Sequence, residues 1–327
     1  MPAPLDDRSV QEIVKDASFA PSMHNAQPWR FAYDRAARVF ELWPDLERAM
    51  AHADRHNRAL HIGCGAALFN LRVAAAHRGW CPDTVILPQP EDQRLLARVR
   101  LYEELTAPQD LAELHPVLYR RHTSRDPFED RRIPQALRDE LCRAAAEEGA
   151  QMTFPSPWHV QSIIGLVQDA EAHDILEHDP DLTRWTYPDA HGPAEGIPEY
   201  AFGPRKHIGR APVRDFAGRR LISGRPAADF EPHPQLALLT TRQDRVQDWI
   251  RAGQALERVL LLATLRGLAT SLTSHALEAP ELRWLVRDPQ APPGHVQMVL
   301  RLGYGPSGRP TPRRPVGEIL IISGRPH

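Results

Sequence analysis

The run Ala20–Phe31, APSMHNAQPWRF, concentrates side chains that can do chemistry in one short connection. Pro21 and Pro28 restrict the backbone and cannot continue a helix, so the polar residues between them lie on a pre-shaped loop. Loops held by rigid neighbours commonly bind ligands. The amides of Asn25 and Gln27 each offer a donor and an acceptor, which suits a heterocycle with alternating N–H and C=O edges. The alternative is an ordinary helix exit in which Asn25 satisfies local backbone groups.

The same run has the form of a family signature. APSMHNAQPWRF closely resembles the APSxxNxQPWRF sequence of the FMN-dependent nitroreductase superfamily, and with His24 in place it is similar to the Acg-like branch. The resemblance covers nearly the whole chain. It implies an α+β nitroreductase-like fold in which this loop borders FMN between two half-sites. It also implies FMN contacts from Pro21, Ser22, Asn25 and Gln27.

A second segment, RHTSR at Arg121–Arg125, resembles the phosphate- and ribityl-binding segment of the same family. Arg121 and Arg125 offer positive charge and paired donors to a phosphate, and His122 and Thr123 add further donors. A solvated basic face is the alternative interpretation, because arginines are abundant throughout this chain.

Two segments near the C-terminus complete the resemblance. Arg313 and Arg314, in TPRRPVGE, match the basic residues of the family's tail, which implies that they close the phosphate pocket. Ala269–Leu277, ATSLTSHAL, stands where the family has a loop that passes over the flavin ring. The match implies that the backbone N–H groups of Ser274, His275 and Ala276 address flavin N5. Hydride transfer at N5 is the cofactor's own reaction, so we expect no catalytic acid or base.

The segments Gly65–Gly79 and Gly253–Gly267 form an internal repeat. Both begin GxAL and end RG in one register, and each is followed by a strand that ends in VRL or LRL. This ordered set indicates an internally duplicated pseudo-dimer in which the two repeat helices are buried and pack against each other. We therefore predict a first half over residues 1–118 and a second half over residues 119–327.

The distribution of the motifs predicts how many flavins the chain holds. The signature loop occurs only in the first half and RHTSR only in the second. The resemblance implies a fused pseudo-dimer with one FMN, whereas ordinary nitroreductases are homodimers with two; further homodimerisation stays open. Within the second half, residues 185–215 are irregular and rich in Pro and Gly, which indicates a lid-like insert or disorder.

Hydrophobic periodicity and turn residues predict alternating helices and strands. A first helix follows the cap Asp6 or Asp7, and the helix at 58–78 is apolar on most faces, which predicts burial. Further helices are expected at 134–149, 158–178 and 242–266. Strands are expected at 29–33, 39–43, 84–87, 96–102, 235–241 and 296–303, with the last of these as the final strand, and a turn-rich linker lies around Thr106–Asp110.

Composition restricts the class of protein. The chain has 327 residues, 42% of them hydrophobic and 25% charged, which is ordinary for a globular protein with a proper core. A net charge of −2 gives no electrostatic case for a nucleic acid or membrane partner. The three cysteines form no paired framework, and neither a signal peptide nor an apolar run of membrane length is seen. These features predict a cytoplasmic protein.

Other motifs carry less chemistry. His52, Asp54, His56 and His61 have the residue types of a metal site, but their segment fits the stretch that leads into the buried helix, so we expect no metal. GCGAAL at Gly63–Leu68 lacks the third glycine of a dinucleotide-binding loop and is typical of close helix packing. Serine and cysteine nucleophiles lack their usual flanking motifs.

Two functions follow from the resemblance. In the first, the protein is an oxidoreductase of the nitroreductase type: NAD(P)H reduces FMN, and the electrons pass to a small nitroaromatic, quinone or other conjugated acceptor. In a variant of this function, a biosynthetic intermediate is oxidised with oxygen as acceptor. In the second, the insert closes the pocket and the protein stores or sequesters FMN without turnover. A fold relative that has lost its flavin is the third interpretation.

Overall fold

The computed structural model describes residues 5–103, 108–177, 180–188, 192–218, 220–278 and 280–324. The linker expected around Thr106–Asp110 lies partly outside these residues. Its described end belongs to the short helix α3 (Gln109–Ala112).

A five-stranded sheet, in the order β13-β1-β2-β4-β3, is built mainly from the N-terminal third of the chain. As predicted, Asp6 caps the first helix by accepting a hydrogen bond of 2.8 Å from the Ser9 backbone N–H. Gly79, with φ of 84°, follows the end of the long helix α2, which also agrees with the prediction. The elements of this sheet and its helices are α1 (Asp7–Ala17), β1 (Trp29–Asp34), β2 (Val39–Pro44), α2 (Arg58–His77), β3 (Cys81–Ile86), β4 (Ala97–Tyr102) and β13 (Leu320–Ser323).

A four-stranded sheet, in the order β11-β12-β10-β5, belongs to the second part of the chain. Two sequence-based expectations are corrected here. Residues 269–277 are not a loop throughout, because the first five form a strand that pairs with β12, and the strand at 296–303 is not the last. The elements are α4 (Gln135–Glu147), β5 (Gln151–Thr153), β10 (Gln235–Thr241), α7 (Val246–Leu265), β11 (Ala269–Thr273), α8 (His275–Glu278) and β12 (His295–Gly303).

The two sheets share one topology. Strands β1, β2, β4 and β3 lie in the same spatial order as β5, β10, β12 and β11, and every neighbouring pair within these sets is antiparallel. Along the chain, the long helix α2 connects β2 to β3, and the long helix α7 likewise connects β10 to β11. This recurrence supports the duplication inferred from the repeat. Strand β13 has no counterpart: it returns from the C-terminus to pair parallel with β1, so the first sheet contains residues from beyond position 118.

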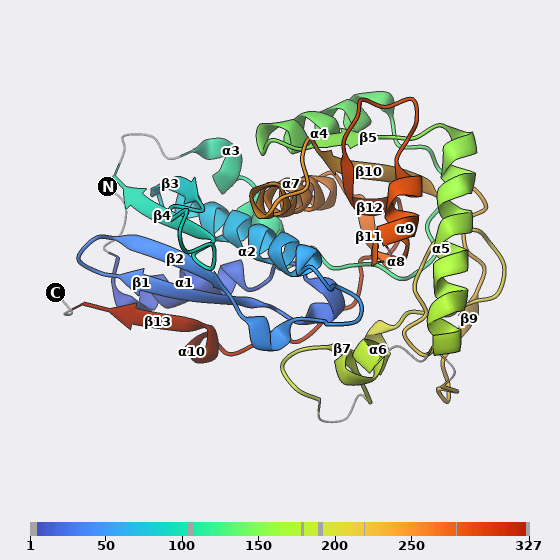
Figure 1. Cartoon of the computed structure of the whole chain (residues 1–327), viewed down its shortest axis with the longest axis horizontal. Helices are drawn as coiled ribbons and strands as arrows, with labels where there is room; N and C mark the ends of the chain where they lie inside the picture. The colour runs from blue at the N-terminus through green and yellow to red at the C-terminus, as the bar shows by residue number, and fades with distance from the viewer. Residues whose placement is uncertain are drawn as a thin grey trace.

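Helices α2 and α7 lie against each other between the two sheets (Figure 1). The repeat glycines Gly65 and Gly253 face each other at their closest approach. A Cβ atom at Gly65 would overlap the Ile250 carbonyl oxygen, and one at Gly253 would overlap the Ile62 carbonyl oxygen. Because the two contacts are reciprocal, the repeat positions lie across a local pseudo-two-fold axis.

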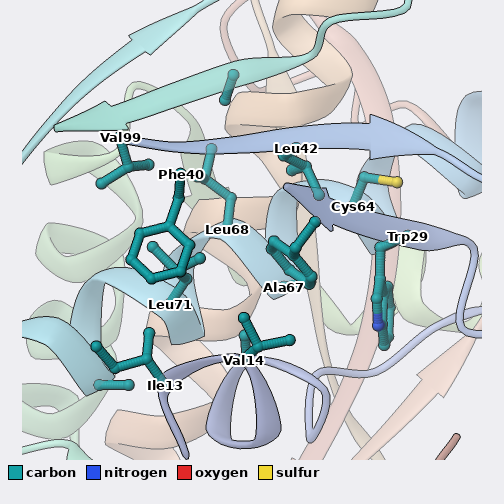
Figure 2. Packing of buried hydrophobic residues seen from close by; sticks show 14 of the residues in the cluster. Ile13, Val14, Trp29, Phe40, Leu42, Cys64, Ala67, Leu68, Leu71 and Val99 are labelled. Carbon is teal, nitrogen blue, oxygen red and sulfur yellow. The ribbon is translucent and has the colours of Figure 1, made fainter. Parts of the chain in front are cut away.

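The buried face of the first sheet packs against helices α1 and α2 (Figure 2). Phe40 and Leu42 of β2 lie in one buried cluster with Leu68 of α2 and with Ile13 and Val14 of α1. All of these side chains are buried. Burial of each large apolar side chain contributes about 1.5–3 kcal/mol, which fixes where the loop between α1 and β1 must lie.

The second sheet is covered on both faces. Ala237 and Leu239 of β10 pack toward α7 and α4, whereas Leu236 and Leu238 pack toward the helix α5 (Pro157–Glu177). The smaller elements are α6 (Pro180–Trp185), β6 (Thr186–Tyr187), β7 (Ile197–Pro198), β8 (Arg205–Lys206), β9 (Ala227–Ala228), α9 (Pro280–Arg283), α10 (Val316–Ile319) and the 3-10 turns η1 (Met23–Asn25), η2 (Leu46–Arg48), η3 (His115–Val117), η4 (Glu199–Ala201) and η5 (Trp284–Val286).

The expectation that no apolar run reaches membrane length needs one correction, because helix α2 is long and apolar enough to cross a membrane by length and composition alone. However, 83% of its most apolar window is buried inside the structure, as expected of a core helix.

Candidate functional site

A cleft that is partly open to solvent is lined by segments from distant parts of the chain; its empty space, open solvent included, is about 1120 Å³. The signature loop, the RHTSR segment, the end of β11 with α8, the insert and the C-terminal segment all reach it. All the predicted site residues except Gln27 and Arg314 line this cleft: Pro21, Ser22, Asn25, Arg121, His122, Thr123, Arg125, Ser274, His275 and Arg313.

The signature loop has an unusual backbone. His24, Asn25 and Gln27 have positive φ values of 48°, 56° and 53°. Such values are uncommon for residues other than glycine, and clusters of them persist where the surrounding structure enforces them. The Ser22 hydroxyl helps to fix the turn by accepting a hydrogen bond of 2.9 Å from the Gln27 N–H.

The two amides of this loop hold other chain segments. The Asn25 Nδ2 group donates to the Gly196 and Pro312 carbonyls at 3.0 and 3.1 Å, and the Gly196 N–H donates back to the Asn25 carbonyl. Gln27 Nε2 donates to the Ala194 carbonyl at 2.8 Å. Both amides therefore connect the loop to the insert, and Asn25 also reaches the C-terminal segment.

Gln27 and Arg314 lie outside the cleft lining and bind each other. The Arg314 backbone N–H donates to Gln27 Oε1 at 2.8 Å, and its guanidinium contacts the buried carboxylate of Asp45 at 3.1 Å. These contacts, together with a hydrogen bond of 3.1 Å from the Arg314 guanidinium to the Gln27 carbonyl, hold the Arg314 side chain behind the loop rather than in the cleft.

One end of the cleft is cationic. Arg121 and Arg313 both donate to the Phe19 carbonyl, at 2.9 and 3.2 Å, so their guanidinium groups converge. Burial and the neighbouring Arg121 lower the pKa of Arg313 to about 9, which leaves it charged at neutral pH. Burial, with Arg121 and Arg313, lowers the pKa of His122 to about 4. A single carboxylate, Glu257, forms an ion pair here among the described residues, with its Oε1 3.5 Å from Arg121 Nε.

The RHTSR segment, Arg121–Arg125, is held in position by the edge of the second sheet. Thr123 forms an isolated parallel bridge with Thr270 of β11, and the Ser124 N–H donates to the Thr270 carbonyl at 2.8 Å. This edge pairing fixes residues 121–125 along the floor of the cleft.

The other end of the cleft is formed by the insert. Arg125 donates to the Ala201 carbonyl at 2.9 Å and lies 4.8 Å from the centre of the Phe216 ring. Arg214 contacts His24 Nε2 at 3.2 Å and the Glu278 carboxylate at 3.0 Å. Arg121 and Arg125, matched together to a phosphate segment, therefore contact different surroundings.

Two histidines at this end are neutral. Burial, together with the nearby Arg214, lowers the pKa of both His24 and His275 well below the ordinary value. Ser274 donates from its hydroxyl to Glu278 Oε1 at 2.7 Å, which fixes the start of α8 against Arg214.

The cleft also has an apolar part to its lining. The side chains come from both long helices, the second sheet and the insert: Ile62, Leu256, Leu272, Met298, Ile197, Val213 and Phe216. An apolar slot with a cationic end suits a flat conjugated ligand that carries a phosphate. Among the described residues there is no group of three or more His, Cys, Asp or Glu side chains that could bind a metal.

Residues 118–304 match the Nitroreductase family. The chain belongs to the nitroreductase family. An uncharacterized protein of Mycobacterium tuberculosis strain H37Rv is 29% identical over 334 residues, 97% of this chain and 94% of that protein. A protein of the same strain with the provisional name NAD(P)H nitroreductase acg is 28% identical over 332 residues, 97% of each chain.

Solved nitroreductase structures are more distant. A nitroreductase with bound FMN from Bacteroides fragilis is 14% identical and covers 62% of this chain and 93% of its own, with a TM-score of 0.38. A BluB-like flavoprotein from Clostridium difficile 630 is 14% identical, and the match covers 64% of this chain and 99% of that protein, with a TM-score of 0.43. The family assignment therefore rests on the sequence match.

Several lining residues of this nitroreductase family member were not predicted from sequence. Arg214 and Phe216 belong to or border an irregular insert, where nothing in the pattern distinguishes one arginine from its neighbours. Arg58 lines the cleft from the start of α2 and donates to the Gln297 carbonyl at 2.6 Å. His24, whose role the signature left open, is a cleft residue. Glu257, which does not line the cleft but pairs with Arg121, was also missed; it lies in the repeat helix, where a charged residue inside a buried apolar run was the available signal.

Proposed function

We propose that this protein binds one FMN in the cleft and transfers electrons from NAD(P)H to a small nitroaromatic, quinone or other conjugated acceptor. One observation carries the proposal: the four segments that resemble flavin-binding motifs converge on one cleft, which combines buried arginines with an apolar lining. Membership of the nitroreductase family and the names of the mycobacterial relatives support the reaction class.

The residues present fit FMN. Arg121 is buried and Arg313 is partly buried. Among the described residues one carboxylate, Glu257, forms an ion pair with Arg121, so an anion beside the two arginines is electrostatically favoured. We propose that Arg121, Arg313, His122 and Thr123 hold the phosphate.

The remaining lining would orient the flavin ring. The ring would lie on the apolar lining of α2 and α7, near the backbone of Ser274 and His275. When bound, FMN supplies the hydride chemistry, and the chain binds, orients and shields it. Pro21, Ser22 and Asn25 would form the edge of this site, with Gln27 and Arg314 supporting the loop from behind.

The test is anaerobic reduction of the FMN-loaded protein by NADPH or NADH, followed by visible absorption. Loss of the oxidised flavin band, and its return when menadione or a nitroaromatic is added, is the expected result. A band that persists with both nicotinamides would contradict the oxidoreductase function.

A specific contact favours a second candidate, storage of FMN without turnover. Arg214 of the insert contacts His24 and Glu278, and Gly196 is hydrogen-bonded to Asn25 of the signature loop. An insert held in this way would restrict the approach of a nicotinamide to a flavin bound in the cleft. If the protein stores FMN, wild type should resist reduction and Arg214→Ala should become reducible. If both are reduced at similar rates, storage is excluded.

A further inference from the structure

A glutamate is buried behind the cationic end of the cleft. Glu257 of α7 is 0% exposed and does not line the cleft, and its Oε1 lies 3.5 Å from Arg121 Nε. Neither of its carboxylate oxygens has a hydrogen bond of good geometry with another described residue. An isolated buried carboxylate is unfavourable unless it is paired or protonated.

The groups that face Glu257 can be named for each element around it. Arg121 approaches from the segment after η3 and Arg313 from the C-terminal segment, while α2 contributes the neutral amide of Asn70. His122, beside the two arginines, is neutral at pH 7 because its pKa is about 4. The charged side chains on nearby turns of α2 and α7 pair with another carboxylate and not with Glu257: Arg72 and Arg258 both pair with Glu148.

Burial is the dominant influence on this carboxyl group. It raises the pKa of Glu257 to about 7, against the opposing effects of Arg121, Asn70 and Arg313. The charge of this side chain therefore changes near neutral pH, where small electrostatic changes at Arg121 have large effects on its protonation.

We propose that Glu257 balances the charge of Arg121 and Arg313 in the ligand-free protein and takes up a proton from solvent when a phosphate group binds these arginines. This inference rests on the proposed function. A phosphate ester carries a charge of about −1.5 to −2 at neutral pH and would compete with the carboxylate for the same two cations. Protonation removes the repulsion between the two anions in a water-poor region. Glu257 is thus a positioning residue that acts through Arg121.

The proposal predicts the direction in which the affinity for FMN changes with pH. Because the complex holds one more proton than the free protein, the Kd for FMN should rise above pH 7, by at most about tenfold per pH unit. The variant Glu257→Gln is neutral at every pH and should lose this rise. The phosphate's own ionisation near pH 6 affects both proteins alike, so it cancels in the ratio of their Kd values.

The experiment is titration of the full-length apoprotein with FMN and with riboflavin, from pH 6 to 8.5, for wild type, Glu257→Gln and Glu148→Gln. Glu148 is a matched control because it is also buried and paired with arginines on α2 and α7, away from the cleft. We expect Glu257→Gln to bind FMN about tenfold or more tightly than wild type at pH 8.5 and similarly at pH 6, with no such difference for Glu148→Gln or for riboflavin.

A second measurement keeps the test valid if the variant does not fold. Calorimetry of the wild type at pH 7.5, in two buffers with different heats of ionisation, should show proton uptake with FMN and little with riboflavin. Binding with parallel pH profiles and no net proton uptake would overturn only this inference. A wild-type protein that binds neither ligand would overturn the proposed function and this inference with it.

Discussion

The amide side chains of the signature loop hold distant segments of the chain. Asn25 and Gln27 have the donors and acceptors to bind a heterocycle, yet their amides hold Gly196, Ala194 and Pro312. Those partners are far away along the chain, so no local pattern contains them. The residue types thus predicted that the loop matters, but not which groups its amides bind.

Arg121 should discriminate between flavins with and without a phosphate. We expect Arg121→Gln to weaken FMN binding by about tenfold to a hundredfold, because a charge-assisted hydrogen bond to phosphate contributes roughly 1.5–3 kcal/mol. Riboflavin affinity should change little, as measured by quenching of flavin fluorescence. Arg98→Gln, which removes a half-exposed ion pair with Glu41 far from the cleft, is the control. Equal losses for FMN and riboflavin would contradict a phosphate contact.

The buried histidines should make the protein less stable in acid. The folded-state pKa of His24 lies well below its ordinary value, mainly through burial, so below about pH 6.5 the unfolded chain binds a proton that the folded chain does not. Stability then falls as pH falls, by up to about 1.4 kcal/mol per pH unit for this group.

The variant His24→Asn, which tolerates positive φ, should remove this contribution. Urea unfolding at pH 7 and pH 5 should show a smaller loss of stability than wild type, while the exposed His207→Asn should behave as wild type. If His24→Asn and wild type lose the same free energy, the imidazole is charged in the folded protein.

At the scale of elements, the two long helices are the part that sequence predicted best. Their length and apolar faces, and the repeat of GxAL and RG, predicted that α2 and α7 pack together. The short elements were missed for a physical reason: β5, β11 and β13 have three to five residues each and are stabilised by pairing with distant strands. Local patterns carry little of that information.

The crossing of the repeat helices gives a steric prediction. Gly65→Ala and Gly253→Ala should each destabilise the protein by about 2–4 kcal/mol, because the new methyl group would overlap a carbonyl oxygen of the facing helix. Gly165→Ala in α5 is the matched control, since nothing lies within 4 Å of its Cβ position. It should be neutral or stabilise by up to about 1 kcal/mol. Chemical denaturation would measure all three, and a mild effect at either repeat glycine would contradict the close crossing.

At the scale of the whole molecule, the C-terminal segment ties the two parts of the chain together. After β12 it passes the cleft at Arg309, Thr311 and Arg313, and then α10 and β13 join the first sheet beside β1 (Figure 1). The predicted division into residues 1–118 and 119–327 places this strand in the other half. Nothing in its sequence showed which sheet it joins.

Because the C-terminal segment packs into the first sheet, substitutions near the end of the chain should change the stability of the protein. Ile319 is buried in the core of the first sheet, so Ile319→Ala should lower the free energy of unfolding by about 2–5 kcal/mol. Ile321, two residues later, is 71% exposed, and Ile321→Ala should change stability by less than about 0.5 kcal/mol. Thermal or urea unfolding of the two variants would compare them directly. Two equally mild variants would contradict the integration of the C-terminus into the first sheet.

The central claim is that the two parts of the chain together form one FMN site. Equilibrium titration of the metal-free, flavin-free protein with FMN, with bound flavin counted by visible absorption, tests this most directly. We predict saturable binding of one FMN per chain. Failure to bind FMN would contradict the assignment of the cleft, and two FMN per chain would contradict the single composite site.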